Sequence, residues 1–378
     1  MSVDFKEFHG RTVMLAAGGT GGHLFPAQAL AEELVRRGYL IHLMTDERVK
    51  DYGKSFPAIE IHEVPSATLS FSKPWLLPQR ALRLWKGYRL ALAILSKVKP
   101  IAVCGFGGYP SFPPLLAATK LNIPSCVHDQ NAVMGRANRA LAKMATAVAS
   151  SFPTLASLPE SAKEKLTVTG NPVRDLVLQS KAAPYAAPDA NGEFHLLVFG
   201  GSQGAQFFSQ FMPNAIRALP QAVLKSLKIT QQCRPEDIEA VKAAYAALGI
   251  KADLAPFFMD MPRRIAQSHL VFCRSGASTI AELGVIGRPA IMVPLPHAID
   301  NDQLKNAESF AKAGAGWIMP QAELTAEKFA GFFMRLRYQQ GELNQAADAA
   351  LTHGKPDAAK RLADLIVKIA GEGKKRTT

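Results

Sequence analysis

The same local pattern opens both halves of this chain, and it constrains the fold more than any other feature. In the first half, an apolar run at residues 12–17 ends in GlyGlyThrGlyGlyHis at 18–23 and leads into a helical stretch. In the second half, a run at 196–199 ends in GlyGlySerGlnGlyAla at 200–205 and leads into another. A strand, a glycine turn and a helix in this order open many α/β domains. The repeat therefore predicts two similar α/β domains.

Short apolar runs alternate with helical stretches through both halves. This alternation predicts parallel sheets with helices on both faces. The 378 residues also exceed what one hydrophobic core usually supports. The strands are expected at 12–17, 41–45, 59–64, 101–105, 125–128, 146–151 and 166–169 in the first half, and at 196–199, 227–232, 253–258, 269–273 and 290–295 in the second.

The boundary between the domains is expected near GlyAsnProValArg at 170–174, which precedes an Ala- and Pro-rich segment at 181–191. We therefore place an N-terminal domain at 1–172 and a C-terminal domain at 173–355. Ligands of such folds bind at the carboxyl ends of the strands, where both glycine turns lie. A cleft between the domains is the expected binding site.

Composition argues against several classes of protein. No apolar run approaches the roughly 18 to 20 residues that cross a bilayer, and the charged N-terminus does not resemble a signal peptide. The four cysteines form no Cys-x-x-Cys pair, which argues against zinc and a disulfide framework and favours a reducing cytosol. The net charge of +13 indicates an acidic partner, but no nucleic-acid-binding module is recognisable. Anionic lipid or diphosphate substrates explain the charge.

The glycine turns can bind phosphate, because their backbone N–H groups and the following helix N-terminus favour an anion. Tight turns without a ligand are the alternative. A nicotinamide enzyme is not expected, since neither turn fits Gly-x-Gly-x-x-Gly.

Polar residues gather at other strand ends. HisAspGlnAsn at 128–131 follows a glycine turn at 105–111, and it either lines a cleft, which we favour, or forms a structural network. CysArgSerGlyAlaSerThrIleAlaGlu at 273–282 runs into a helix that Ser275, Ser278 or Thr279 could cap. Asp300, in the segment at 296–307, is expected to cap the next helix.

These motifs occur in the order seen in one family. The chain resembles the MurG family of N-acetylglucosaminyltransferases, which convert lipid I to lipid II, in its motifs at 18–23, 107–109, 128–131, 170–174, 200–205, 273–277 and 297–303. The resemblance implies a GT-B fold, with two Rossmann-like domains of parallel sheets facing each other across a cleft. The N-terminal domain would face the lipid acceptor and the membrane, and the C-terminal domain would hold the UDP-sugar. A helix near 356–371 would pack back on the first domain.

The resemblance also implies roles for individual residues. His23 is the first choice for general base, with Asp129 as the alternative base and simple positioning of the acceptor diphosphate as the alternative role of His23. Glu282 would bind the ribose, Phe258 would lie near the uracil, and Arg174 would neutralise the leaving group. The full set implied for the donor is Thr20, Gly21, Gly22, Asn131, Arg174, Ser202, Gln203, Gly204, Phe258, Ser278, Thr279, Glu282 and Gln303. The set implied for the acceptor side is Gly18, Gly19, Gly108, Tyr109 and His128. The family often has Glu at the position of Asp129, and His or Gln at that of Asp302.

The implied reaction is inverting. The 4-hydroxyl of the muramyl sugar attacks C1 of UDP-GlcNAc, and no metal in the protein is required, although Mg2+ can accompany the diphosphate substrates. The implied partners are UDP-GlcNAc, lipid I, an anionic membrane surface on its cytoplasmic face, and proteins of cell-wall synthesis and division. The alternatives are another GT-B enzyme, such as a non-hydrolysing sugar-nucleotide epimerase, and a nucleotide-binding membrane adaptor without catalysis.

Residues 69–90 are expected to dock on the membrane. The apolar candidates are Phe71, Trp75, Leu76 and Leu77, and the cations that follow are Arg80, Arg83, Lys86 and Arg89. Apolar anchors beside cations are typical of an interfacial segment. The alternative is that Trp75, Leu82 and Trp85 pack in the domain core while the cations are simply solvated.

Overall fold

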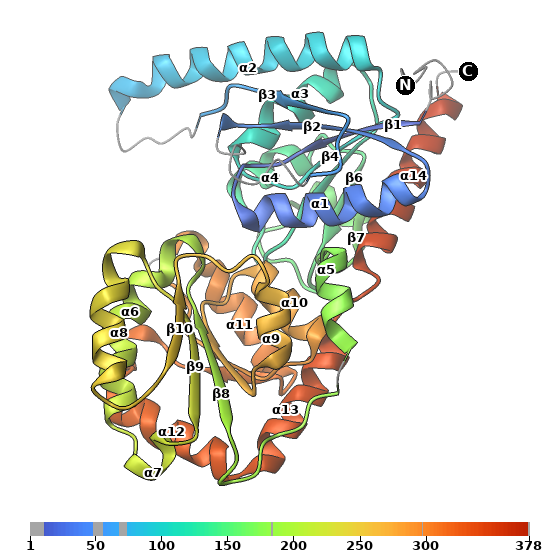
Figure 1. Cartoon of the computed structure of the whole chain (residues 1–378). Coiled ribbons are helices and arrows are strands. Elements are labelled where there is room, and N and C mark those ends of the chain that lie inside the picture. Colours follow the sequence, from blue (N-terminus) through green and yellow to red (C-terminus); the bar gives the residue numbers. More distant parts are fainter. Residues whose placement is uncertain (1–10, 48–55, 68–73, 183, 297, 377–378) are drawn as a thin grey trace, which may run out of the picture. The chain divides into compact units, whose positions relative to one another are not determined.

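The chain folds into two compact units, each with its own parallel sheet and hydrophobic core (Figure 1). The computed structural model describes residues 11–47, 56–67, 74–182, 184–296 and 298–376. Unit 1 joins Met1–Asp175 to Pro356–Thr378, and unit 2 is Leu176–Lys355. The C-terminal segment therefore belongs to the same unit as the N-terminus.

The sheet of unit 1 has seven strands in the order β3-β2-β1-β4-β5-β6-β7. These strands are β1 (Thr12–Ala16), β2 (Leu40–Thr45), β3 (Glu60–Glu63), β4 (Ala102–Gly105), β5 (Ser125–Asp129), β6 (Ala147–Ser150) and β7 (Leu166–Val168). Its helices are α1 (Gly21–Arg36), α2 (Leu77–Val98), α3 (Phe112–Lys120), α4 (Arg136–Ala142) and α14 (Ala358–Arg376). Helix α5 (Asp175–Gln179) begins at Asp175, where the first segment of unit 1 ends, and continues in unit 2.

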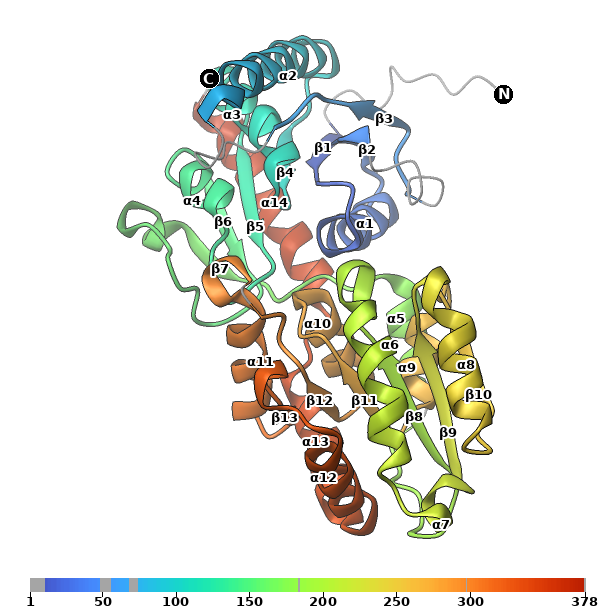
Figure 2. The same ribbon diagram turned by 90° about the vertical axis from the view of Figure 1, so that its left-hand side faces the viewer.

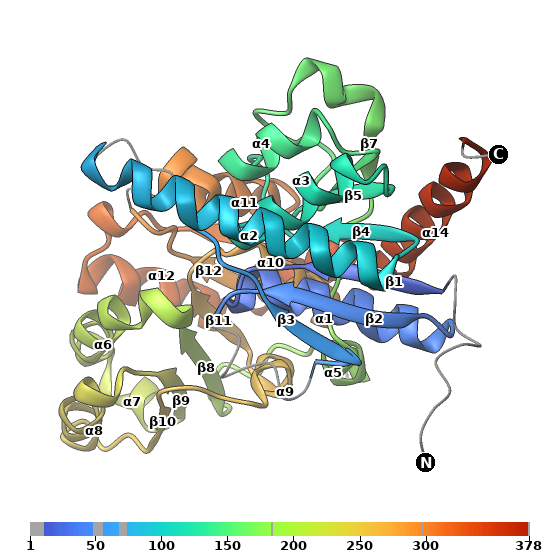
Figure 3. The ribbon, with the colours of Figure 1, turned by 90° about the horizontal axis from the view of Figure 1, so that it is seen from above.

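Alternating side chains of the unit 1 strands divide between two layers of helices. Val13 and Leu15 of β1 pack with α1 and α14, whereas Met14 and Ala16 pack with α2, α3 and α4. Helix α14 supplies Leu362 to the first layer. Helix α2 runs along the top of unit 1 in Figure 1, with β1, β2 and β3 beneath it, and Figure 3 looks down on this helix. A strand buried on both faces is the expected environment of a parallel sheet.

The sheet of unit 2 has six strands in the order β10-β9-β8-β11-β12-β13. They are β8 (Phe194–Phe199), β9 (Leu227–Gln232), β10 (Ala252–Ala255), β11 (Leu270–Cys273), β12 (Ala290–Met292) and β13 (Gly316–Ile318). The helices are α6 (Gly201–Arg217), α7 (Gln221–Leu224), α8 (Ile238–Ala246), α9 (Met261–Gln267), α10 (Ala277–Ile286), α11 (Asp302–Lys312), α12 (Ala326–Tyr338) and α13 (Gln340–His353). Side chains of α6, α8 and α12 pack with one face of β8. Figure 2 shows the ribbon of α6 running beside that of β8.

Every predicted strand is present in the two sheets, and all strand pairs are parallel as predicted. The strand β13 was not predicted, because it is short and begins in a glycine-containing stretch, Gly314 to Gly316, which reads as a turn. Each sheet changes its direction of winding once, between β1 and β4 in unit 1 and between β8 and β11 in unit 2. Such switch points are where open α/β sheets bind ligands.

Candidate active site

The switch point of unit 1 brings two glycine turns together. The first turn follows β1, and the second follows β4, its neighbour in the sheet. The backbone N–H of Phe106 donates to the carbonyl of Ala16 at 2.8 Å, and the N–H of Gly19 donates to Oδ1 of Asp46 at 3.2 Å. Thr20 is the N-cap residue of α1, so Gly21 and Gly22 form the first turn of that helix. Their N–H groups lack intrahelical acceptors and can meet an anion.

His23 lies against the second glycine turn. Gly107 and Gly108 have φ angles of 84° and 71°, which favour glycine. A Cβ atom on Gly108 would lie 3.3 Å from Cδ2 of His23, and one on Gly107 would lie 3.0 Å from Nδ2 of Asn138. Tyr109 begins the short helix that follows. Glycine at 107 and 108 therefore leaves room for the imidazole of His23.

A chain of hydrogen bonds fixes the tautomer of His23. Carbonyl oxygens only accept, so Nε2 of His128 donates to the carbonyl of Gly170 at 3.0 Å. Nε2 of Gln130 donates to the carbonyl of His128 at 3.1 Å and to Nδ1 of the same residue at 3.0 Å. Oε1 of Gln130 must then accept from Nδ1 of His23, at 3.1 Å. The lone pair of a neutral His23 imidazole is therefore on Nε2.

The cluster at 128–131 is mostly a buried network, so the prediction that it lines a cleft is wrong for three of its four residues. His128, Asp129 and Gln130 are at most 2% exposed, and only Asn131 is partly exposed. Burial lowers the pKa of His128 to about 4, against an upward effect of its bond to the Gly170 carbonyl. A buried neutral His128 cannot contact the acceptor, and it acts instead by orienting Gln130.

Asp129 organises the loop after β5. Its carboxylate accepts from the N–H groups of Asn131 at 3.1 Å and Gly135 at 2.9 Å, and from Nδ2 of Asn138 at 2.9 Å. Burial raises the pKa of Asp129, while these three bonds and His23 oppose the rise. With its oxygens committed to the loop, Asp129 is less suited than His23 to take a proton from a substrate.

The GlyAsnProValArg motif supplies two further groups to unit 1. The guanidinium of Arg174 lies over the ring of Phe25 in α1, 3.8 Å from its centroid. Asn171 is 6% exposed, and neither of its side-chain amide atoms has a hydrogen-bond partner among the described residues. A buried amide without partners indicates a ligand or water contact.

In unit 2 the glycine turn after β8 begins α6. Gly201 has a φ of 67°, and the N–H groups of Gly200 and Gly201 both donate to Oε1 of Gln232, at 3.3 and 3.1 Å. These two amides are therefore already occupied within the protein. Those of Ser202 and Gln203, in the first turn of α6, lack intrahelical acceptors and remain the candidates, whereas the N–H of Gly204 is the first with an acceptor inside the helix.

The second helix at this switch point is α10. Its N-cap is Gly276 and it has no side-chain cap, so the alternative that a hydroxyl caps the helix is wrong. Ser275 instead donates to the carbonyl of Gln303 at 2.8 Å. The buried hydroxyl of Ser278 has no hydrogen-bond partner among the described residues. Glu282 lies one turn further on the same face of the helix and is 9% exposed.

Thr279 completes the first turn of α10, and Gln303 lies in the first turn of α11. Oε1 of Gln303 accepts from the N–H of Leu295 at 3.0 Å, which leaves its Nε2 to point elsewhere. The N-cap of α11 is Asn301, so the prediction that Asp300 caps this helix is wrong. Asp302 accepts from the N–H of Gln303 at 2.8 Å, and burial raises its pKa.

Phe258 follows β10 and is covered on its ring. The guanidinium of Arg264 lies 4.0 Å from the ring centroid, and Phe258 is 6% exposed. A nucleobase near this position would therefore meet the backbone rather than the ring. Gln130, Asn138 and Gln232 were not predicted as site residues, because each has a partner on another element of the fold.

The segment predicted to dock on the membrane is largely exposed. Trp75 is 70% exposed, Leu82 51% and Trp85 55%, so the alternative that they pack in the core is wrong. Arg83, Lys86 and Arg89 are exposed, and Leu76, Leu77 and Arg80 are partly exposed. The guanidinium of Arg89 lies 5.4 Å from the Trp85 ring centroid. Phe71 lies outside the described residues.

Comparison with known proteins identifies the family to which both halves of the chain are similar. Residues 13–150 match the glycosyltransferase family 28 N-terminal domain, and residues 195–362 match its C-terminal domain. A relative from Sinorhizobium fredii is 54% identical over 361 residues, which cover 95% of each chain. It is named UDP-N-acetylglucosamine–N-acetylmuramyl-(pentapeptide) pyrophosphoryl-undecaprenol N-acetylglucosamine transferase.

Solved structures confirm the predicted GT-B fold class. The crystal structure of MurG from Acinetobacter baumannii has a TM-score of 0.74 and 31% identity, covering 95% of this chain and 99% of that one. A UDP-N-acetylglucosamine 2-epimerase has a TM-score of 0.67 over 96% of each chain, but at 14% identity it shares the fold alone. The chain therefore belongs to glycosyltransferase family 28, within the MurG group of UDP-sugar-dependent N-acetylglucosaminyltransferases.

Proposed function

We propose that the chain transfers N-acetylglucosamine from UDP-GlcNAc to the 4-hydroxyl of the muramyl sugar of lipid I, giving lipid II and UDP with inversion at C1. The names of its relatives support the substrates. The observation that carries the chemistry is the fixed tautomer of His23, whose Nδ1 donates to Gln130. Its Nε2 then accepts the proton of the attacking hydroxyl, which a neutral imidazole can do near pH 7.

The donor would bind at the switch point of unit 2. First-turn amides of α6 and α10 and the hydroxyl of Ser278 would meet the diphosphate, because helix N-termini favour anions. Glu282, on the same face of α10, would accept hydrogen bonds from the ribose hydroxyls. Arg174 would add positive charge as the UDP leaves.

These groups stabilise the leaving group with backbone dipoles and one guanidinium. We propose that the transfer needs no metal held by these residues, and that Mg2+, where it takes part, arrives with a diphosphate substrate. Thr20, Gly21 and Gly22 would meet the substrate beside His23, since the N-terminus of α1 lies in the same turn. Gly18, Gly19, Gly108 and Tyr109 would form the acceptor side of that turn.

We further propose that α2 and the residues before it dock on the cytoplasmic face of an anionic membrane, where lipid I would be reached. The 22 residues of α2 include five cations and no Asp or Glu. The exposed large apolar side chains here are Trp75, just before the helix, and Leu82, Trp85 and Leu90 within it. Among the described residues, no helix is long and apolar enough to span a membrane. Partner proteins of cell-wall synthesis would find the chain at that surface.

The test measures UDP release with lipid I, with lipid-free muramyl pentapeptide and with no acceptor, side by side. We expect rapid release with lipid I, slower release with the lipid-free acceptor, and almost none without an acceptor. Equal release in all three would indicate hydrolysis rather than transfer. Conversion of the donor sugar without UDP release would indicate an epimerase, and binding without turnover would indicate an adaptor.

A further inference from the structure

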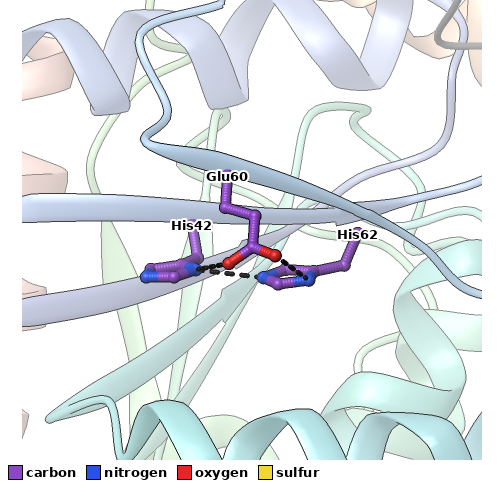
Figure 4. A group of neighbouring side chains, drawn as sticks. All are labelled: His42, Glu60 and His62. Carbon is purple, nitrogen blue, oxygen red and sulfur yellow. Dashed lines mark hydrogen bonds and ion pairs between the residues drawn. The ribbon is translucent and has the colours of Figure 1, made fainter.

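Two histidines and one glutamate gather at the edge of the unit 1 sheet, apart from the residues assigned to sugar transfer (Figure 4). His42 lies on β2, and Glu60 and His62 lie on β3, the outermost strand of the sheet. His42 pairs with Glu60, and His62 is two residues further along β3. All three side chains therefore project from the same face of the sheet.

We propose that His42, Glu60 and His62 form a binding site for a divalent transition-metal ion of the Zn2+ class. Nδ1 of His42 lies 3.0 Å from Nε2 of His62. Two nitrogen ligands of a tetrahedral Zn2+ ion lie about 3.3 Å apart, so the observed separation is close to that of a bound ion. The two rings face each other in nearly parallel planes, so they must turn for both lone pairs to meet one ion. The possible ligand atoms of all three residues lie within 4.8 Å of one another.

The carboxylate of Glu60 lies between the two rings. Its Oε2 is 3.7 Å from Nδ1 of His42, and its Oε1 is 3.6 Å from Nδ1 of His62. Figure 4 shows Glu60 reaching over both imidazoles. Two imidazoles and one carboxylate favour Zn2+, Ni2+ or Cu2+ over Mg2+ and Ca2+, which prefer oxygen ligands. Water would complete the coordination.

The surroundings keep the imidazoles ready to bind. Burial is the largest influence on both histidines, and it lowers the pKa of each ring. Neutral rings are the form that binds a metal. The charge of Glu60 opposes the lowering in both rings, whereas Lys97 adds to it for His62. The rings are nearly parallel, with an interplanar angle of 4°. The Glu60 side chain is 62% exposed, so an ion could enter from solvent.

A hydrogen bond between two neutral rings would give the same 3.0 Å separation. A metal ion would take the place of the shared proton, so the two states exclude one another. Bound metal would join the edge strand β3 to β2 through side chains as well as through the backbone pairing. The folded state would then be stabilised in proportion to the logarithm of the free metal concentration.

The experiment compares the chelator-treated full chain with Glu60→Gln, His62→Gln and Glu63→Gln. Glu63 lies on the same strand as Glu60 but on the other face of the sheet, so it controls for loss of one carboxylate. Zn2+ binding is measured by titration calorimetry, and the rise in Tm with Zn2+ is measured for each protein. Mg2+ at the same concentration provides the comparison ion.

We expect the parent and Glu63→Gln to bind one Zn2+ equally and to gain the same Tm. Glu60→Gln should bind at least about tenfold more weakly, and His62→Gln should lose this site. Mg2+ should have no effect on Tm in any of them. The proposal is overturned if the parent binds no Zn2+, or if Glu60→Gln and His62→Gln bind it as the parent does. Should His62→Gln fail to fold, the exposed Glu60 decides the matter alone.

Discussion

Gln130→Met tests whether the buried network sets the tautomer of His23. Methionine has nearly the volume of glutamine but neither donates nor accepts a strong hydrogen bond. The change removes the acceptor for Nδ1 of His23, at 3.1 Å, and the donor to Nδ1 of His128, at 3.0 Å. His23 could then place its proton on either nitrogen, and part of the population would lose the lone pair on Nε2.

Two separate magnitudes follow from these contacts. His128 is fully buried, so its unpaired Nδ1 should lower the free energy of unfolding by about 1 to 3 kcal/mol. His23 is partly exposed and can bond to water, so only the net value of one hydrogen bond is lost, about 0.5 to 1.5 kcal/mol. In turnover this is about a 2- to 13-fold fall in kcat. His23→Ala should lower kcat by about 10² or more.

The assay is a double-mutant cycle of Gln130→Met and His23→Ala, with kcat and urea unfolding measured for each protein. In the His23→Ala background, Gln130→Met should no longer affect kcat but should still cost stability through His128. Gln28→Met is the matched control, because Gln28 is on the same helix as His23 and its side chain donates to Glu32 instead. An equal fall in kcat with and without His23 would refute the assigned role of Gln130.

The remaining predictions concern the donor site, a buried histidine and the membrane surface. Glu282→Ala should raise KM for UDP-GlcNAc about 10- to 150-fold, because hydrogen bonds to a charged group are worth about 1.5 to 3 kcal/mol. KM for lipid I should change less. An unchanged donor KM in a folded protein would remove Glu282 from the site. Unfolded His128 takes up a proton near pH 6.5 but the folded residue does so only near 4, so the free energy of unfolding should fall by about 2 kcal/mol from pH 7 to 5. Urea unfolding of His128→Gln should show a smaller pH dependence, and an unchanged one would contradict the assignment. Trp75→Ser/Trp85→Ser should weaken sedimentation with anionic vesicles, whereas Met259→Ser, at an apolar residue of unit 2 that is 81% exposed, should not. If the double variant binds the vesicles as the parent and Met259→Ser do, the docking surface lies elsewhere.

Local sequence patterns were sufficient to predict the sheets. Most of the strands are apolar runs between turn residues, and burial on both faces makes such runs continuous. The edge strand β3, with the sequence Glu-Ile-His-Glu, is an exception. The glycine turns could also be predicted, because a cluster of glycines between an apolar run and a helical stretch indicates a tight turn. The exposed face of α2 could also be predicted in outline, from the regular spacing of Arg83, Lys86 and Arg89.

Only the tertiary structure decided which polar groups meet. The bond between His23 and Gln130 spans 107 residues, and that between His42 and His62 joins neighbouring strands. The absence of Cys-x-x-Cys pairs therefore says nothing about a cluster built from two strands. Sequence also could not tell that the polar run at 128–131 is buried, since a polar side chain can be buried when partners satisfy it. Those partners are set by strand order and register, and a local pattern in the sequence records neither.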